Sequence, residues 1–126
     1  MVSEFLAFII EDDYDLSNIF EKALQAAEFE TQVFRRGDTA YEALSTVSPD
    51  VVVLDLHLPF VEGIEILERI RTAAHLKKTR IIIVSADDRL AETLREKADL
   101  VLIKPVEFGQ LRGLSARLRH AGYQNA

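Results

Sequence analysis

The sequence predicts an α/β domain: a doubly wound, five-stranded parallel sheet with helices on both faces. Short apolar runs, rich in β-branched residues, alternate with stretches in which apolar residues recur every three or four positions. Two of the runs, residues 51–54 and 81–84, are apolar throughout, which is typical of strands covered on both faces. Consecutive parallel strands separated by helices imply right-handed crossovers.

The first two predicted strands, residues 5–10 and 31–34, are each followed by a helix. Apolar residues at steps of three and four place one apolar stripe on the first helix. They are Leu16, Ile19, Phe20, Ala23, Leu24 and Ala27. The second helix begins at Gly37 and Asp38, with Asp38 as the expected N-cap. Its inward-facing residues are expected to be Ala40, Ala43, Leu44 and Val47.

The remaining strands are predicted at residues 51–54, 81–84 and 100–103, and Pro49 and Asp50 separate the first of these from the helix before it. Three further helices are indicated by apolar positions spaced as on one helix face. These positions are Ile64, Leu67 and Ile70; then Leu90 and Leu94; then Phe108, Leu111, Leu114 and Leu118. The last helix is expected to end near His120, which leaves 121–126 as a short polar tail.

Length and composition predict one domain spanning residues 1–126, with no effector domain. A net charge of −6 argues against direct binding to nucleic acid, because phosphate backbones attract concentrated Lys and Arg. The chain has no cysteine, so disulfides and thiolate chemistry are excluded. No apolar run approaches the ~20 residues of a membrane span, and no signal peptide is apparent. We therefore expect a cytoplasmic protein without membrane segments.

Polar residues follow four of the predicted strands. Glu11 and Asp12 come after the first, Asp55 ends the third, Ser85 ends the fourth and Lys104 follows the fifth. An Asp after a strand is often only a turn or cap residue that bonds its own backbone. However, the carboxyl ends of parallel strands share one edge, where open α/β sheets bind ligands. Four strands delivering these groups by accident is improbable, so we predict one site.

These residue types favour phosphoryl chemistry. Carboxylates brought close together repel one another unless a cation or a proton lies among them, and an all-oxygen ligand set favours Mg²⁺ over zinc. A carboxylate beside Mg²⁺ and an ammonium group can attack phosphorus, because both cations neutralise the oxygens of the transferring group. The product would be an acyl phosphate on Asp55.

The chain resembles the receiver domains of two-component response regulators. The matching motifs are FIIEDDYDL, VVVLDLHLPFVEG, IIIVSA and LIKPV, and the resemblance covers essentially the whole chain. It implies a flavodoxin-like sheet of strand order 2-1-3-4-5. It also implies a phosphoacceptor, not an enzyme in the usual sense, that receives a phosphoryl group from a sensor histidine kinase or phosphotransfer protein. The output would be a downstream protein or effector domain, with a homodimer left open.

By this resemblance Asp55 is the phosphorylated residue and a ligand of Mg²⁺. Glu11 and Asp12 match the acidic pair that binds the metal, and His57 stands where the family supplies a backbone carbonyl ligand. Asp13 then begins the helix that follows and is not a ligand.

Two further site residues are implied by the same resemblance. Ser85 stands where the family has a Thr or Ser that bonds the phosphoryl group, and Lys104 matches the family's lysine. Pro105 after it suggests a cis peptide bond. Two side chains keep alternative readings. His57 is a solvent-exposed loop residue or holds a water near the acyl phosphate, and Asp87 caps a helix or acts in the same way as His57.

The chain departs from the family at two places. Val101 occupies the position, three residues before Lys104, where most receivers carry an aromatic side chain that moves on activation. The interval from Ser85 to Lys104 is also about three residues shorter than usual, so the fourth helix or its loops must be trimmed. We therefore expect phosphorylation to be signalled through a different element or a weaker rearrangement.

Two function classes remain. The first is a phosphorylation-controlled switch that alters a protein-binding surface. The second is a receiver-like binding or scaffolding module that does not use phosphorylation, which a missing acid, acceptor or lysine would indicate, and none is missing. A flavin carrier is disfavoured because Glu11 and Asp12 would repel its phosphate.

Overall fold

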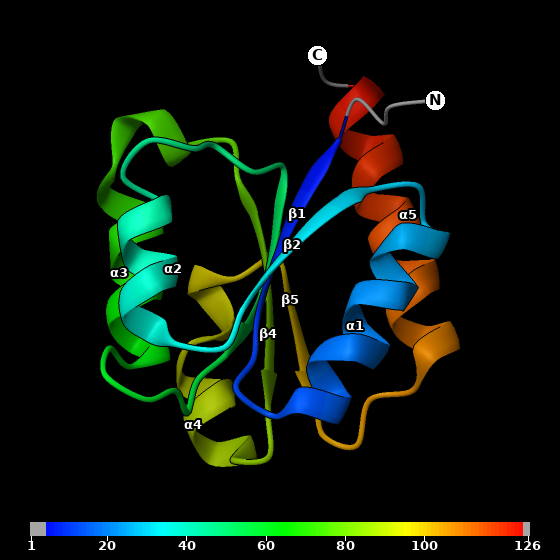
Figure 1. Cartoon of the computed structure of the whole chain (residues 1–126). Helices are drawn as coiled ribbons and strands as arrows, with labels where there is room; N and C mark the ends of the chain where they lie inside the picture. The colour runs from blue at the N-terminus through cyan, green and yellow to red at the C-terminus, as the bar shows by residue number, and fades with distance from the viewer. Residues whose placement is uncertain (1–4, 125–126) are drawn as a thin grey trace.

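A computed structural model describes residues 5–124, with side chains described for residues 5–119. Strands and helices alternate along the chain (Figure 1). The strands are β1 (Leu6–Ile10), β2 (Glu30–Phe34), β3 (Val51–Asp55), β4 (Arg80–Ser85) and β5 (Leu100–Ile103). The helices are α1 (Tyr14–Ala26), α2 (Gly37–Ala43), α3 (Gly63–Thr72), α4 (Asp88–Thr93) and α5 (Phe108–Gln124). Short 3-10 turns, η1 (Ala74–Leu76) and η2 (Arg95–Lys97), lead into β4 and β5.

The strands form one parallel five-stranded sheet in the order β2-β1-β3-β4-β5. Helices α1 and α5 pack together on one face of the sheet, and α2 and α3 pack together on the other (Figure 1). The predicted fold class and strand order are therefore confirmed. None of the helices within residues 5–124 has the length and apolar character needed to cross a bilayer.

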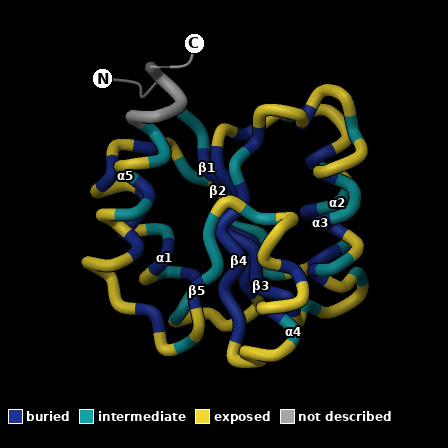
Figure 2. The backbone as a smooth tube through the Cα atoms, turned by 180° about the vertical axis from the view of Figure 1, so that it is seen from behind, coloured by how far each residue is buried: buried dark blue, intermediate teal, exposed yellow. Residues whose placement is uncertain are grey.

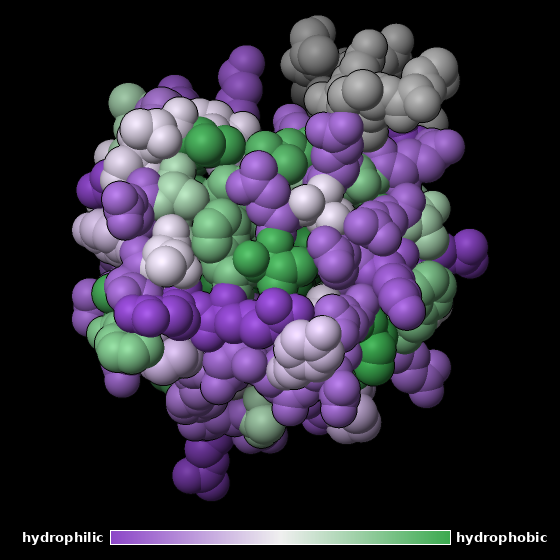
Figure 3. Space-filling view, viewed as in Figure 1, coloured by the Kyte–Doolittle hydropathy of each residue, from purple (hydrophilic) through white to green (hydrophobic). Residues whose placement is uncertain are grey.

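The central strands are buried on both faces, which is why their sequences show no alternation. All five residues of β3 are buried, and the sheet forms the dark core of Figure 2. Successive side chains point to opposite faces. Val51 and Val53 thus pack with Leu24 of α1 and Leu111 of α5, whereas the intervening Val52 packs on the α2–α3 face. The face of the molecule over edge strand β2 is mostly hydrophilic, with a hydrophobic group near its centre (Figure 3).

Two sequence-based expectations about the helices are wrong. Asp38 is not the N-cap of α2, because Arg36 holds that position and makes no side-chain capping bond. The Asp38 carboxylate instead pairs with the Arg36 guanidinium at 2.8 Å and accepts a hydrogen bond from the Thr39 amide. The last helix also extends to Gln124, four residues past the expected end. The polar composition after His120 is compatible with helix, so composition alone did not locate its end.

The fourth helix is short. It covers only Asp88–Thr93 before the η2 turn, which agrees with the short interval between Ser85 and Lys104. Val101 of β5 is half-buried and packs against the core on the α2–α3 face. A small side chain thus lies at this position of the sheet, as the sequence indicated.

Candidate functional site

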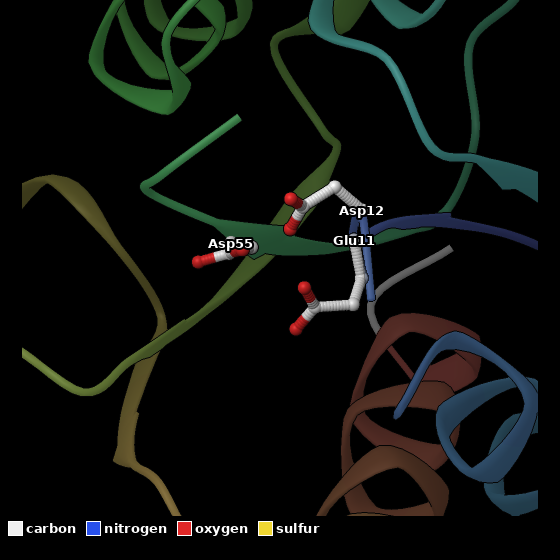
Figure 4. Close-up of side chains that lie close together, drawn as sticks. All are labelled: Glu11, Asp12 and Asp55. Carbon is white, nitrogen blue, oxygen red and sulfur yellow. The ribbon is translucent and has the colours of Figure 1, made fainter. Parts of the chain in front are cut away.

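Three carboxylates gather at the carboxyl edge of the sheet. Glu11 and Asp12 follow β1, and Asp55 ends the neighbouring strand β3. One carboxylate oxygen from each lies within 4.8 Å of the others. Figure 4 shows the three side chains extending from the two strand ends into the same region. Glu11 and Asp55 are only 1% and 4% exposed, whereas Asp12 faces solvent. The structure thus brings together the three predicted acidic residues.

Lys104 reaches this cluster from the end of β5. Its Nζ lies 2.8 Å from Oε1 of Glu11 and 3.7 Å from Oδ2 of Asp55. One ammonium group beside three carboxylates leaves an excess of negative charge. A hard divalent cation with oxygen ligands would balance that excess, and the chemistry of the donor set fits Mg²⁺.

The electrostatics of the cluster appear most clearly in Glu11. Burial, followed by the neighbouring Asp55 carboxylate, raises the pKa of Glu11 from 4.5 to about 7, although Lys104 opposes this change. For Lys104, burial by itself lowers the pKa, but the bond to Glu11 and the charges of Asp55, Glu11 and Asp12 outweigh it and raise the pKa. The ammonium group therefore stays charged, and Glu11 exchanges its proton near neutral pH.

The backbone around Asp55 is held by the loop that follows it. The His57 amide donates a hydrogen bond to Oδ1 of Asp55 at 3.2 Å, and the His57 side chain is exposed. The Gly63 amide donates to the Leu56 carbonyl at 3.1 Å. A Cβ atom at Gly63 would lie 2.4 Å from the Asp55 carbonyl oxygen, so only glycine allows α3 to start this close to the acceptor.

Ser85 lies at the same edge, but its hydroxyl is engaged by the next turn. It is fully buried, and its Oγ accepts a hydrogen bond from the Asp87 amide at 2.9 Å and donates one to the Asp87 carbonyl at 3.4 Å. The Asp87 carboxylate in turn accepts from the Leu90 amide at 3.0 Å as the N-cap of α4. The capping interpretation of Asp87 is therefore confirmed. Ser85 can bond an incoming group only after its hydroxyl turns away from Asp87.

Asp13 is directed to the helix and not into the acidic cluster. Its side chain accepts a hydrogen bond from the Leu16 amide at 2.9 Å as the N-cap of α1. Its amide donates to Oε2 of Glu11 at 3.3 Å, so it orients one ligand without being one. The assignment of Glu11 and Asp12 as the acidic pair is consistent with this geometry. The expected cis peptide bond between Lys104 and Pro105 is also present.

Sequence reasoning missed two features beside the site. The first is the pairing of Lys104 with Glu11, which is closer than its pairing with Asp55. The second is Phe60, which has a φ of 73° and is 74% exposed. An aromatic residue after Pro59 carries no signal for a left-handed conformation, so only the structure reveals it.

The sheet order and the position of the acidic cluster define a doubly wound domain of the CheY-like type. The profile of the response regulator receiver domain family matches residues 7–115, and the chain belongs to this family.

Curated relatives and solved structures agree with this assignment. The chain is 33% identical over 117 residues to the phosphate regulon transcriptional regulatory protein PhoB of Rhizobium meliloti, with 90% of this chain and 52% of the relative aligned. It is 32% identical to the transcriptional regulatory protein QseB of Haemophilus influenzae, with 94% and 55% aligned. The chain thus spans about half the length of these relatives.

Among solved structures, a CheY-like response regulator receiver domain from Methylobacillus flagellatus superposes with a TM-score of 0.80 and 26% identity, covering 92% of this chain and 99% of that one. The signal receiver domain of a putative Luxo repressor protein from Vibrio parahaemolyticus gives a TM-score of 0.84 at 22% identity, covering 95% and 93%. The second likeness shows the fold alone.

Proposed function

We propose that this domain accepts a phosphoryl group on Asp55 from a sensor histidine kinase or phosphotransfer protein, and that the added charge changes a protein-binding surface. The observation that supports this is the composition of the edge cluster. A nearly buried Asp55 lies beside two further carboxylates and a charged lysine, and these four groups converge from the ends of three strands, β1, β3 and β5. Buried like charges are costly, so their retention here is best explained by a bound cation and an anionic reactant.

Mg²⁺ would be held by the carboxylates of Glu11, Asp12 and Asp55 together with the backbone carbonyl of His57. When bound, it supplies charge neutralisation for the oxygens of the transferring phosphoryl group. Lys104 lies close enough to Asp55 to neutralise a further oxygen of that group. Lys104 therefore pairs with Glu11 in the metal-free state, and it would pair with the phosphoryl group once Asp55 is phosphorylated.

The transfer step is a displacement at phosphorus. An Asp55 carboxylate oxygen forms the new P–O bond while the P–N bond of a phosphohistidine donor breaks, and the donor imidazole leaves with the bonding electron pair. No proton needs to be removed from Asp55 because it attacks as a carboxylate. Ser85, once its hydroxyl turns from Asp87, would donate a hydrogen bond to a phosphoryl oxygen. The domain is thus a phosphoacceptor that assists its own modification, not a turnover enzyme.

The proposal also includes the output partner and the cellular location of the domain. Relatives named as transcriptional regulatory proteins are about twice as long as the aligned region, so a downstream effector domain or a separate protein is the proposed output. We place the domain in the cytoplasm, where a kinase can reach it. A binding module that does not use phosphorylation is less well supported, because it would not require the acceptor, both acids and the lysine to converge.

The test is phosphorylation with a small donor. The protein is incubated with acetyl phosphate, with and without Mg²⁺, and its intact mass is followed. One Mg²⁺-dependent phosphoryl group is expected on the unaltered chain and none on Asp55→Asn. The matched control is Asp13→Asn, which keeps a capping side chain and should still be phosphorylated. Absence of phosphorylation, together with no binding of a beryllium fluoride mimic, would favour the phosphorylation-independent module.

A further inference from the structure

We propose that the phosphorylation state is transmitted to the surface by the β3–α3 loop, residues 56–62, acting on the start of α2, with Phe60 as the residue that moves. We call this segment the acceptor loop. The inference rests on the proposed phosphorylation of Asp55 and goes beyond it by locating the responding element.

Both ends of the acceptor loop lie against the backbone at Asp55. Leu56 follows Asp55 directly, and its carbonyl accepts a hydrogen bond from the Gly63 amide at 3.1 Å. The Cα of Gly63 packs so closely on Asp55 that a Cβ would lie 2.4 Å from the Asp55 carbonyl oxygen. A shift of Asp55 toward a phosphoryl group and a metal ion therefore acts on the loop at two points.

The tip of the loop is attached to the start of α2. The Gly37 amide donates to the Pro59 carbonyl at 3.0 Å. A Cβ at Gly37 would lie 1.8 Å from the Val61 carbonyl oxygen, so the helix and the loop touch backbone to backbone. The Arg36 guanidinium lies 4.1 Å from the centre of the Phe60 ring. Movement of the loop must therefore displace α2, or break these contacts.

The backbone of Phe60 is in an unfavourable conformation, and its exposed side chain gains little packing energy to offset the cost. Its φ of 73° lies in the left-handed region, which bulky L residues rarely adopt, and its side chain is 74% exposed. Arg36 covers the ring and is itself held by two hydrogen bonds to Asp38, at 3.0 and 2.8 Å. Phe60 is therefore strained, and its side chain is held by one exposed stack, so a modest change at Asp55 can release it.

The region beyond α4 is anchored more firmly. Nε of Arg71 in α3 donates to the Lys97 carbonyl of η2 at 2.6 Å, and its NH2 group contacts Asp99 at 3.3 Å. The same Asp99 carboxylate accepts from the Ile81 amide of β4 at 2.7 Å. Lys97 also pairs with Glu68 of α3. These contacts fix η2 and the start of β5 to α3 and β4, which directs the response toward the acceptor loop.

The first experiment uses Phe60→Trp, which introduces the sole tryptophan of the chain. Trp can keep the stack with Arg36, because indole is the best partner for a cation. Beryllium fluoride with Mg²⁺ is added, and the emission maximum and acrylamide quenching are followed. The matched control is Phe108→Trp, at an aromatic residue that is 42% exposed on the β5 side. We expect a clear change at position 60 and a smaller one at position 108.

A second experiment separates the stack from the strain. Arg36→Ala removes the stack and leaves the strain, so the mimic should bind about two- to fivefold more tightly. Adding Phe60→Asn to Arg36→Ala relieves the left-handed strain, because Asn tolerates that region, and should weaken binding again. Equal affinities for all variants would overturn the inference.

Failure of this inference and failure of the proposed function give different results. Mimic binding or phosphorylation of Asp55 with an unchanged signal at position 60, or a larger change at position 108, contradicts the acceptor-loop inference alone. No binding and no phosphorylation in any variant contradicts the proposed function and this inference with it.

Discussion

Charged groups gather at both ends of the same sheet, but with opposite balance. At the carboxyl edge, three carboxylates share one lysine, and two of those carboxylates are almost fully buried. At the other edge, the Asp99 carboxylate has two arginine partners, Arg71 and Arg80, at 3.3 and 3.7 Å, and also accepts the Ile81 amide. The second cluster is satisfied within the protein. The first is satisfied only by a partner from outside, so its stability depends on a ligand.

The largest difference between the two ends of the sheet should appear on removing one lysine from each, Lys104 of the first cluster and Lys97 beside the second. Lys104→Met should lower the rate of phosphorylation by acetyl phosphate by about 100-fold or more at saturating Mg²⁺, because the charge that faces the phosphoryl oxygens is lost. Lys97→Met removes a lysine paired with Glu68 far from the acceptor and should leave this rate unchanged. An equal fall in the phosphorylation rate of both variants would show that the lysine at the carboxyl edge has no special role in the reaction. The measurement is intact mass against time.

The carboxyl edge should also make stability depend on pH. The pKa of Glu11 is about 7 in the folded protein against an ordinary 4.5, so the folded state holds this proton more tightly. Its stabilising contribution is complete below pH 4.5 and is lost as the pH rises through 7, by about 3 kcal/mol in total. Urea unfolding with a chelator at several pH values, beside Glu11→Gln, measures it.

The Glu11→Gln variant removes this titrating group, together with its contribution to the raised pKa of Lys104. The difference between the two proteins in unfolding free energy should therefore change over this window, and Mg²⁺ should restore more stability above pH 7 in the unaltered chain than in the variant, which lacks one of the three carboxylates. If the unfolding free energies of the two proteins changed with pH in parallel, the titrating group would not be Glu11.

A substitution in the Asp99 cluster should lower the unfolding free energy of the domain and leave the phosphorylation of Asp55 unchanged. Asp99→Ala leaves the Ile81 amide without its side-chain acceptor and removes the carboxylate that pairs with Arg71 and Arg80, so it should destabilise the domain by about 2 kcal/mol. Phosphorylation of the folded fraction should remain near normal. Urea unfolding and the mass assay, run on the same sample, check both parts. A slowed phosphorylation at full folding would instead reveal coupling between the two edges.

The smallest effect is expected for an exposed pair. Arg95 and Glu92 form an ion pair at 2.9 Å, but their side chains are 55% and 66% exposed. Arg95→Ala should therefore change the unfolding free energy by about 0.5 kcal/mol or less. A loss as large as that of Asp99→Ala would mean that charge pairing alone, and not shared backbone contacts, stabilises this end of the domain.

The sequence was sufficient for the parts of the molecule with a strong local pattern. Apolar runs located four of the five strands, and the carboxylates and the lysine at the strand ends converge as expected, because parallel strands share an edge. Side-chain pairings and loop conformations were not visible in the sequence. The N-cap assigned to Asp38 failed because Arg36 attracts its carboxylate. Likewise, the conformation of Phe60 follows from the contacts of its loop with α2.

The close packing of Gly63 on the acceptor strand has a consequence for how the family can vary at this point. The segment from Asp55 to Gly63 begins at the end of β3 and returns to contact the backbone of Asp55 and Leu56. The number of residues in it therefore sets where α3 starts. An inserted or deleted residue would have to move either the acceptor or the whole of α3. On the other side of the site, α4 covers only Asp88–Thr93 and is followed directly by the η2 turn. Length variation should therefore collect after Ser85 and be absent between Asp55 and Gly63.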